Sequence, residues 1–346
     1  MGYKKSLVSS NILFLHGFPE LSYSFRYLMQ ELAEQGFYCV APDQRGYGDT
    51  DYKNDTEKYI SKFSVLNLTK DIFFLLKNLN IQRVNIIGHD FGSYISYYFS
   101  LLHPTMVESL ITMSMPFGGA PSNKSLVNTN DINTLNKNLL KLKPPRKHYQ
   151  KYFASKCAVN NIENCNQGIF KFLKGYFYYK SKDYKKNKPH KLSSFSASGL
   201  SVMPEYYVMR RHLGMAETVE KASPVSNYQL SWITDKELRI YANSFKKRGI
   251  CDPLKWYKVM ISSVEKKRII ELNLPRTIRT PSLFIAGDAD WGPYQKPQEL
   301  ERMSNFFLKN FHGIKIIKDA GHWVQQENYK DCCKEILNFY KNNNIV

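Results

Sequence analysis

The sequence predicts an α/β fold, in which a mostly parallel sheet is flanked by helices and a mainly helical segment is inserted between two strands. Short apolar runs alternate along the chain with amphipathic stretches of helical spacing, which is typical of a parallel sheet covered by helices. This alternation stops between Gly118 and about Arg268 and then resumes. We therefore expect a core formed by residues 1–118 and 269–346, and an inserted cap, here called the lid, formed by residues 119–268.

The expected strands are short apolar runs that are long enough to cross one sheet. They cover residues 11–17, 37–43, 83–90, 107–116, 282–290 and 314–322. The expected helices of the core carry apolar residues at helical spacing and cover residues 22–36, 65–80 and 328–343. Within the lid, we expect the asparagine-rich stretch 121–138 to be a loop and the Tyr-, Phe- and Lys-rich segments that follow it to be helical.

The composition is that of a globular protein with an excess of basic residues. Hydrophobic residues make up 43% and charged residues 23% of the chain, which excludes a protein disordered throughout. The 49 Lys and Arg residues outnumber the 30 Asp and Glu residues and give a net charge of +19. Such a charge can indicate a nucleic-acid or anionic-surface partner. Because the basic residues are spread thinly, we expect no nucleic-acid partner and attribute the charge to solubility.

Six cysteines lie scattered along the chain, and none of them forms a CxxC pair. This pattern indicates neither a zinc site nor a routine disulfide, so we expect no metal and a reducing compartment, by default the cytoplasm. No run of about 18 apolar residues and no signal peptide is visible, and we therefore expect no transmembrane segment. A targeting segment could lie upstream, and the sequence leaves the oligomeric state open.

Residues 88–92, "GHDFG", have the glycine spacing of a nucleophile elbow, the G-x-S-x-G turn between a strand and a helix, with Asp90 at the serine position. An apolar strand precedes the motif and a helix-compatible segment follows it, as the elbow requires. An aspartate helix cap between two chance glycines is the alternative. An aspartate nucleophile would form an ester with a saturated carbon that carries an epoxide oxygen or a halide. Water would then attack the carbonyl of that ester.

Hydrolysis of such an ester requires a base and an acid that orients it, in the chain order nucleophile, acid, histidine. His322 follows the last expected strand behind a glycine, and "GDAD" offers Asp288 and Asp290 at the end of the preceding strand. The other place for the acid, after the strand at residues 107–116, carries no carboxylate. The backbone N–H groups of Phe18 and Phe91 are the expected oxyanion hole, although HGFP also fits a plain loop.

With these residues in hand, the sequence resembles the soluble epoxide hydrolases of the α/β-hydrolase fold over nearly its whole length. The motifs that carry the resemblance are "HGFPE", "DQRGYGDT", "GHDFG", "GDAD" and "GHW". The resemblance implies that Asp290, rather than Asp288, is the acid and that Pro19 is cis. It also implies that every role is filled by protein groups, with no metal or organic cofactor.

Two lid segments extend the resemblance. "HYQKYF" places Tyr149, and "DPLKWYKVM" places Tyr257, where the family has two tyrosines that hold the epoxide oxygen and protonate it as the ring opens. A tyrosine suits this role because its ordinary pKa of about 10 keeps it protonated at neutral pH. The expected partners are water and a small apolar epoxide, for which a fatty-acid epoxide is the natural candidate. We expect the following residues to bind it: Phe18, Pro19, Phe91, Gln150 and Trp323.

The sequence departs from the family at three places. Phe91 follows the nucleophile where the family usually has tryptophan, Ser93 replaces a small Gly or Ala, and the strand hairpin that precedes "ILFLHG" in the family is largely missing. A haloalkane dehalogenase is the nearest alternative, but it needs side-chain N–H donors for the halide, commonly the indole of a tryptophan after the nucleophile, and the side chain of Phe91 has no such donor. A non-catalytic lipid-binding protein of the same fold is the other alternative. Such proteins typically lose the nucleophile, the histidine or the acid, whereas this chain has all three.

Overall fold

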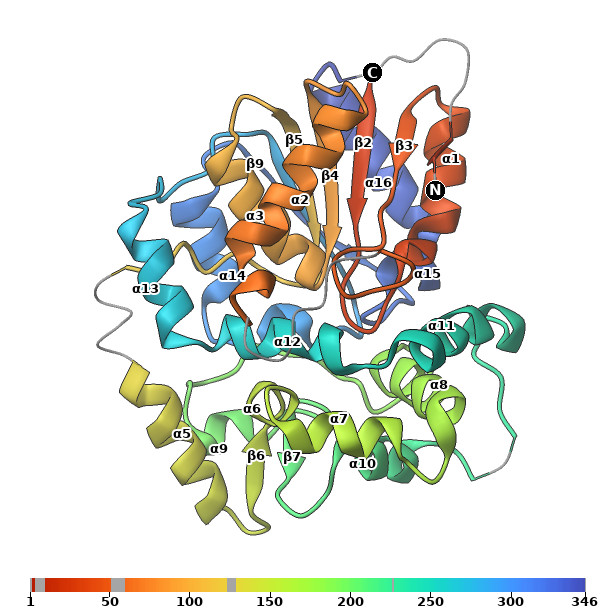
Figure 1. The fold of residues 1–346 in the computed structure, drawn as a ribbon, viewed down its shortest axis with the longest axis vertical. Coiled ribbons are helices and arrows are strands. Elements are labelled where there is room, and N and C mark those ends of the chain that lie inside the picture. The colour runs from red at the N-terminus through yellow and green to blue at the C-terminus, as the bar shows by residue number, and fades with distance from the viewer. Residues whose placement is uncertain (1, 4–9, 51–59, 123–128, 226, 346) are drawn as a thin grey trace.

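A seven-stranded sheet forms the core, in the strand order β1-β3-β2-β4-β5-β8-β9 (Figure 1). The structure is a computed structural model that describes residues 2–3, 10–50, 60–122, 129–225 and 227–345. Only β1 is antiparallel to its neighbour. The strands are β1 (Gly2–Tyr3), β2 (Asn11–Leu15), β3 (Tyr38–Val40), β4 (Val84–His89), β5 (Val107–Met113), β8 (Ser282–Gly287) and β9 (Phe311–Ile317).

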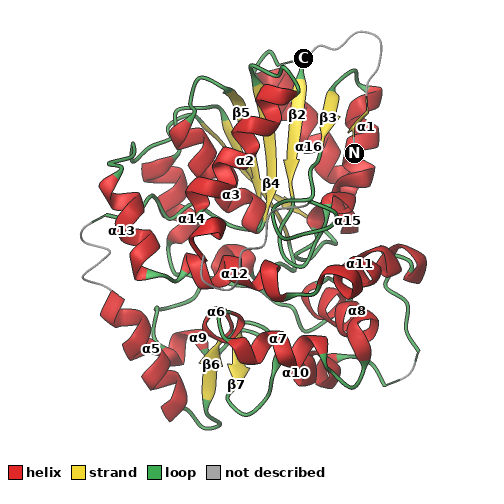
Figure 2. Ribbon diagram, in the orientation of Figure 1, coloured by secondary structure: helices red, strands yellow, loops and turns green. Residues whose placement is uncertain are grey.

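Helices connect the strands of the core, as a parallel sheet requires. They are η1 (Ser22–Phe25), α1 (Arg26–Glu34), η2 (Ile60–Phe63), α2 (Val65–Asn78), α3 (Phe91–Leu102), η3 (Gly292–Tyr294), α14 (Glu299–Arg302), η4 (Met303–Phe307), α15 (Val324–Glu327) and α16 (Tyr329–Asn342). Figure 2 shows the helices packed around the strands. The predicted α/β class, with a mostly parallel sheet, is therefore confirmed.

The sheet separates two hydrophobic cores because successive side chains of a strand point to opposite faces. On β2, Leu13 and Leu15 belong to the core that also contains the apolar faces of α2 and α3. Ile12 and Phe14, which alternate with them, belong to the core that contains α1 and α16. The sheet is thus buried on both faces, and its strand ends are the places where polar side chains can gather.

The lid lies between β5 and β8 in the sequence and beside the carboxyl ends of the strands in space (Figure 1). It is mainly helical, with one two-stranded antiparallel sheet. Its elements are α5 (Thr129–Lys141), β6 (Arg146–His148), α6 (Tyr149–Phe153), α7 (Lys156–Glu163), α8 (Gly168–Lys180), α9 (Ala197–Leu200), β7 (Val208–Arg210), α10 (Met215–Ala222), α11 (Asp235–Arg248), α12 (Cys251–Met260) and α13 (Ser263–Glu271). The lid therefore covers the sheet edge where the predicted nucleophile lies.

The structure differs from the sequence-based expectations in the asparagine-rich stretch and at the N-terminal edge of the sheet. The asparagine-rich stretch was expected to be a loop, but its second half forms α5; residues 123–128 lie outside the described residues. At the N-terminal edge of the sheet, β1 pairs antiparallel with β3, so this edge has a short partner.

The expected division of the chain into core and lid at residues 118/119 and 268/269 stays a prediction, and its second boundary falls inside α13. None of the described helices is both long and apolar enough to cross a membrane.

Candidate active site

A sharp turn between β4 and α3 carries Asp90 above the carboxyl end of the sheet. The backbone of Asp90 has φ 50° and ψ −116°, which is strained for a residue with a side chain. The turn is possible because two glycines flank it. A Cβ at Gly92 would lie 1.8 Å from the carbonyl oxygen of Leu15, and a Cβ at Gly88 would lie 2.6 Å from the carbonyl oxygen of Gly92. The spacing "GHDFG" thus matches an elbow in which strand and helix pack too closely for side chains.

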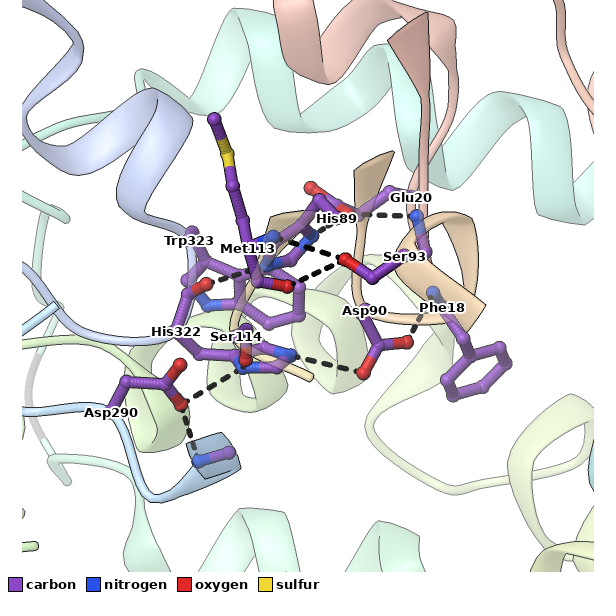
Figure 3. Close-up of polar contacts among 12 residues, drawn as sticks. Phe18, Glu20, His89, Asp90, Ser93, Met113, Ser114, Asp290, His322 and Trp323 are labelled. Carbon is purple, nitrogen blue, oxygen red and sulfur yellow. Dashed lines mark hydrogen bonds and ion pairs between the residues drawn. The ribbon is translucent and has the colours of Figure 1, made fainter. Parts of the chain in front are cut away.

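The carboxylate of Asp90 lies between the loop after β2 and the loop before α15 (Figure 3). The backbone N–H of Phe18 donates a hydrogen bond of 3.2 Å to Oδ1. On the other side, Nε2 of His322 lies 3.6 Å from Oδ2, which is ion-pair range but too long for a hydrogen bond. The side chain of Asp90 is 17% exposed. The carboxylate is therefore held at one oxygen while the other faces a histidine nitrogen.

The opposite nitrogen of His322 is held by two groups. Nδ1 lies 3.1 Å from Oδ1 of Asp290 and 2.7 Å from the hydroxyl of Ser114. The same oxygen of Asp290 accepts a hydrogen bond of 2.7 Å from the N–H of Gly292. Asp288 is exposed and accepts a hydrogen bond from the N–H of Ala320. Of the two aspartates in "GDAD", it is therefore Asp290 that lies beside His322.

Both aspartates of the site are held in the ionised form. Burial opposes the charge on Asp90, but the neighbouring His322 outweighs burial. Two buried cations, Lys180 and His89, act in the same direction, so the pKa of the Asp90 carboxyl lies well below its usual range. Burial likewise opposes the charge on Asp290, and here too His322 outweighs it and lowers the pKa. An ionised carboxylate and an imidazole nitrogen therefore face each other at 3.6 Å, which is too close for a water molecule to lie between them.

A buried ion pair supports the loop that carries His322. Nδ1 of His89 lies 2.5 Å from Oε2 of Glu20, and Nε2 lies 2.7 Å from the carbonyl oxygen of His322. Because a carboxylate and a carbonyl both accept hydrogen bonds, both nitrogens of His89 donate, and the ring is the charged imidazolium. Burial opposes that charge, but Glu20 outweighs burial and raises the pKa of His89. The residue before the nucleophile thus fixes the backbone of the predicted base.

The two predicted lid tyrosines lie over the elbow. The ring of Tyr257 packs edge-on against Phe91 at 4.7 Å and Phe18 at 5.4 Å between ring centroids. The ring of Tyr149 lies 5.9 Å from that of Tyr257, and its hydroxyl donates a hydrogen bond of 2.8 Å to Gln295. Burial is the main cause that raises the pKa of both phenols above 10. Both hydroxyls therefore remain proton donors at neutral pH.

Four of the residues expected to bind substrate lie on the loops and the turn that carry Asp90, His322 and the N–H of Phe18. Phe18, Pro19, Phe91 and Trp323 are buried, and the Phe18–Pro19 peptide bond is cis, as the resemblance implies. The indole N–H of Trp323 donates to the carbonyl of Phe177 at 2.9 Å, so this ring is fixed. The N–H of Phe91 belongs to the first turn of α3, whose N–H groups have no partner within the helix.

A cleft of about 290 Å³ opens between the lid and the core. It is lined by apolar and aromatic side chains, by two amides, Gln150 and Gln295, and by four charged residues, Glu265, Lys266, Lys296 and Glu299. Both amides hydrogen-bond the hydroxyl of Tyr149, at 3.3 Å and 2.8 Å. Tyr149 itself does not line the cleft, so these two amides separate the cleft from the phenol. Within the part of the chain that the structure describes, no group of three or more His, Cys, Asp or Glu side chains is arranged to hold a metal ion.

Sequence reasoning missed several residues that complete the site. Glu20 and His89 lie inside the motifs "HGFPE" and "GHDFG" but were given no role, because their pairing is visible only in three dimensions. Ser114 follows β5, at the place where a carboxylate was sought and not found. Lys180 lies in a segment of the lid without any motif, and nothing in the sequence singles it out.

The fold and the site together define a hydrolase of the α/β class. Residues 11–329 match the family model described as alpha/beta hydrolase fold, and the chain belongs to this family. Among curated proteins, the chain is 26% identical over 335 residues to epoxide hydrolase B of Mycobacterium tuberculosis and to epoxide hydrolase 3 of Siraitia grosvenorii. Each alignment covers 95% of this chain and 90% of the relative.

Solved structures agree with the sequence relatives. A mutant of an epoxide hydrolase from Solanum tuberosum superposes with a TM-score of 0.75 at 26% identity, covering 99% of this chain and 94% of that one. An epoxide hydrolase from an endophytic Streptomyces has a TM-score of 0.77 at 21% identity, which supports the fold alone. The resemblance to the epoxide hydrolases, drawn above from the motifs, is confirmed by these similarities.

Proposed function

We propose that the protein is an epoxide hydrolase that converts epoxides to vicinal diols through a covalent ester on Asp90. One observation carries the proposal: Oδ2 of Asp90 faces Nε2 of His322 at 3.6 Å, while Nδ1 of the same ring faces Asp290 at 3.1 Å. A carboxylate at an elbow, with a base aimed at it, suits formation and hydrolysis of an ester. The relatives named above are epoxide hydrolases, which supports the same reaction.

In the first half-reaction, a carboxylate oxygen of Asp90 attacks one carbon of the epoxide. A bond forms between that oxygen and the carbon, and the bond from the carbon to the ring oxygen breaks. The departing oxygen takes a proton from Tyr149 or Tyr257, whose buried hydroxyls remain protonated at neutral pH. The product is a hydroxyalkyl ester of Asp90, and the strain of the three-membered ring drives its formation.

In the second half-reaction, His322 removes a proton from water, and the resulting hydroxide attacks the carbonyl carbon of the ester. The tetrahedral intermediate carries its negative charge on the former carboxylate oxygen. The N–H of Phe18 already donates to Oδ1 of Asp90, and the N–H of Phe91 at the start of α3 is the expected second donor. Collapse of the intermediate releases the diol, and His322 returns its proton to the leaving oxygen.

The aromatic lining of the site suits an apolar epoxide. The rings of Phe18, Phe91 and Tyr257 are buried, with Phe18 and Phe91 next to the carboxylate and Tyr257 packed on both of them. A lipid epoxide, such as the epoxide of a fatty acid, combines a long apolar chain with one polar ring. We therefore propose lipid epoxides as the substrate class.

The arrangement favours an epoxide over a haloalkane. A departing halide is stabilised by side-chain N–H donors, but the side chain of Phe91 has none, and the indoles that contact Phe91 and His322 are engaged. Trp256 donates to the carbonyl of Arg45, and Trp323 donates to the carbonyl of Phe177. A departing alkoxide needs a proton, which the two phenols can supply.

The experiment that tests the proposal compares two substrates on the purified protein. Diol formation from trans-stilbene oxide is measured beside chloride release from 1-chlorobutane. We expect diol without chloride, and no diol from the Asp90→Ala variant. Chloride release without diol would identify a dehalogenase. If neither product forms but a lipid binds saturably, the protein is a non-catalytic binder, and the proposed function is wrong.

A further inference from the structure

Lys180 is a buried lysine that has no place in the mechanism above. It is the last residue of α8, and 3% of its surface is exposed. Its backbone carbonyl accepts a hydrogen bond of 3.0 Å from the N–H of His322. The end of this lid helix is therefore docked directly on the loop that carries the base, and its position relative to His322 is fixed.

The ammonium of Lys180 lies among aromatic rings. Nζ is 5.2 Å from the ring centroid of Trp323, 5.3 Å from that of Tyr207, 5.4 Å from that of Tyr176 and 6.0 Å from that of Tyr206. Such rings stabilise a cation by their negative faces, and most strongly where water is excluded. In the described parts of the chain, no carboxylate lies within ion-pair distance of Nζ, which is unusual for a buried lysine.

Three carboxylates of the site interact electrostatically with this ammonium. They belong to Asp90 at the elbow, Asp290 on the loop after β8 and Glu20 on the loop after β2. Burial lowers the pKa of Lys180 to about 8, and the three carboxylates oppose burial, so the side chain stays charged at neutral pH. Lys180 in turn lowers the pKa of Asp90. The interaction is therefore mutual and runs through the reacting centre.

Ester formation changes the charge balance of the site. Before the reaction, Glu20, Asp90 and Asp290 carry three negative charges, His89 and Lys180 carry two positive charges, and a proton on His322 supplies the third, in line with the lowering of the Asp90 pKa by His322. Esterification makes Asp90 neutral, so the two remaining negative charges are balanced by His89 and Lys180 alone. His322 can then be neutral without leaving the buried site charged. Without Lys180, the ester state would have a net negative charge, which favours a protonated His322 that cannot act as a base.

We propose that Lys180 is a positioning residue for ester hydrolysis, whose charge keeps His322 in its neutral, basic form once Asp90 is esterified. This inference rests on the proposed epoxide hydrolase function. The ammonium acts through His322 and does not touch the reacting atoms. The other titratable groups around Nζ, Tyr176, Tyr206 and Tyr207, remain neutral phenols because burial raises their pKa values well above 10. Beside the loop of His322, Glu327 at the end of α15 accepts hydrogen bonds from the N–H groups of Gly321 and Trp323, and burial raises its pKa to about 8.

The test measures the rate of ester breakdown as a function of pH. The ester is formed in a single turnover with trans-stilbene oxide, quenched in acid and counted by intact-mass spectrometry. The rate should fall at acidic pH, and we call this part of the profile its acid limb. In the Lys180→Met variant, we expect the midpoint of the acid limb to lie about one pH unit higher than in the wild-type protein, because the loss of a unit charge within the site changes a neighbouring pKa by about one unit. Lys180→Arg keeps the charge, and the midpoint of its acid limb should equal that of the wild-type protein.

Two controls separate charge from folding. Lys171→Met removes a positive charge from an exposed position of the same helix and should leave the profile unchanged. Lys180→Gln removes the charge with a polar side chain and serves if the methionine variant does not fold, as checked by thermal unfolding. A purely structural role would slow breakdown equally at every pH.

The failure of this inference differs from that of the proposed function. If the wild-type protein turns over the epoxide but the neutral variants keep its acid limb, the role of Lys180 is wrong and the proposed function stands. If the wild-type protein forms neither ester nor diol with any epoxide, the proposed function is wrong, and the role of Lys180 falls with it.

Discussion

Asp90 and His322 are placed by opposing requirements that only a folded site can satisfy. The carboxylate must stay ionised although it is buried, and the imidazole must face it without forming a tight ion pair. The first requirement is met by the surrounding cations, which lower the pKa of Asp90. The second is met by Asp290 and Ser114, which hold Nδ1 and leave Nε2 at 3.6 Å from the carboxylate.

His322→Gln should separate the two half-reactions. Asp90 can still open the epoxide, but no base activates water, so the ester should accumulate and diol formation should fall by roughly 10²–10⁴-fold. Intact-mass spectrometry should show protein plus the mass of one epoxide. Asp90→Ala is the matched control and should show no adduct. Diol formation at the wild-type rate without an adduct would remove His322 from the mechanism.

The lid tyrosines should act as partly interchangeable acids. Tyr149→Phe and Tyr257→Phe should each leave measurable activity, whereas the double variant should lose most of it, because a general acid contributes roughly 10²–10⁴-fold. The measurement is the rate of ester formation in a single turnover, which isolates the ring-opening step. Tyr184→Phe, a half-buried lid tyrosine away from the elbow, controls for loss of a phenol. Equal rates in the double variant and the wild type would contradict the assignment.

The residues predicted from the sequence are those that a short motif marks. Asp90 lies between two glycines that the turn requires, and His322 follows a strand behind another glycine, so chain order alone separates them from other residues. Lys180, Ser114 and the pairing of Glu20 with His89 are different. Their positions depend on which strand ends and lid helices meet in space, and no short sequence pattern predicts these contacts.

At the scale of elements, the lid is joined to the core by polar contacts as well as by packing. Glu237 lies in the first turn of α11 in the lid, where its side chain completes a capping box with Thr234. The same carboxylate accepts hydrogen bonds from Arg26 at 2.8 Å and Tyr27 at 2.7 Å, both on α1 of the core. One residue thus caps a lid helix and ties it to the sheet layer.

Glu237→Gln should weaken this connection in a pH-dependent way. Burial opposes its charge, but the donors outweigh burial and lower the pKa of Glu237 to about 2. Since this lies below the ordinary value of about 4.3, the stabilisation is complete above that pH and is lost as the pH falls toward 2. At pH 7, we expect the variant to lose about 1–2 kcal/mol of unfolding free energy in urea titrations.

Glu220→Gln is the matched control, because Glu220 is exposed on the neighbouring lid helix α10. It should change the unfolding free energy by less than about 0.5 kcal/mol. The difference between the two variants should shrink between pH 4 and pH 2. A constant difference over this range would show that the charge of Glu237 does not stabilise the fold.

The order of strands and helices in the core could be predicted because apolar periodicity is local. The fold of the asparagine-rich segment could not. Asparagine has low helix propensity, yet α5 forms there and packs Leu135 and Leu139 into the main core. Burial of those leucines outweighs the low helix propensity of the asparagines. Such tertiary contacts cannot be inferred from the composition of the segment.

At the scale of the whole molecule, the net charge of +19 should not produce a nucleic-acid-binding protein. Several lysines and arginines are engaged in ion pairs, among them Arg45 with Asp71 and Lys174 with Asp235. We expect no binding to a 20-base-pair DNA duplex below about 10 µM protein at 150 mM salt, measured by fluorescence polarisation. Weak binding at 20 mM salt would be non-specific. Submicromolar binding at 150 mM salt would reveal a basic surface that the account does not include.

The whole arrangement, from elbow to lid, serves one covalent step at Asp90. The direct measurement is a single turnover with excess enzyme in ¹⁸O-labelled water, followed by mass spectrometry of the peptide that contains Asp90 and of the diol. We predict that the label enters the carboxylate of Asp90, because water attacks the carbonyl of the ester. Label found in the diol alone, with an unlabelled peptide, would mean that water opens the ring directly and would contradict the account.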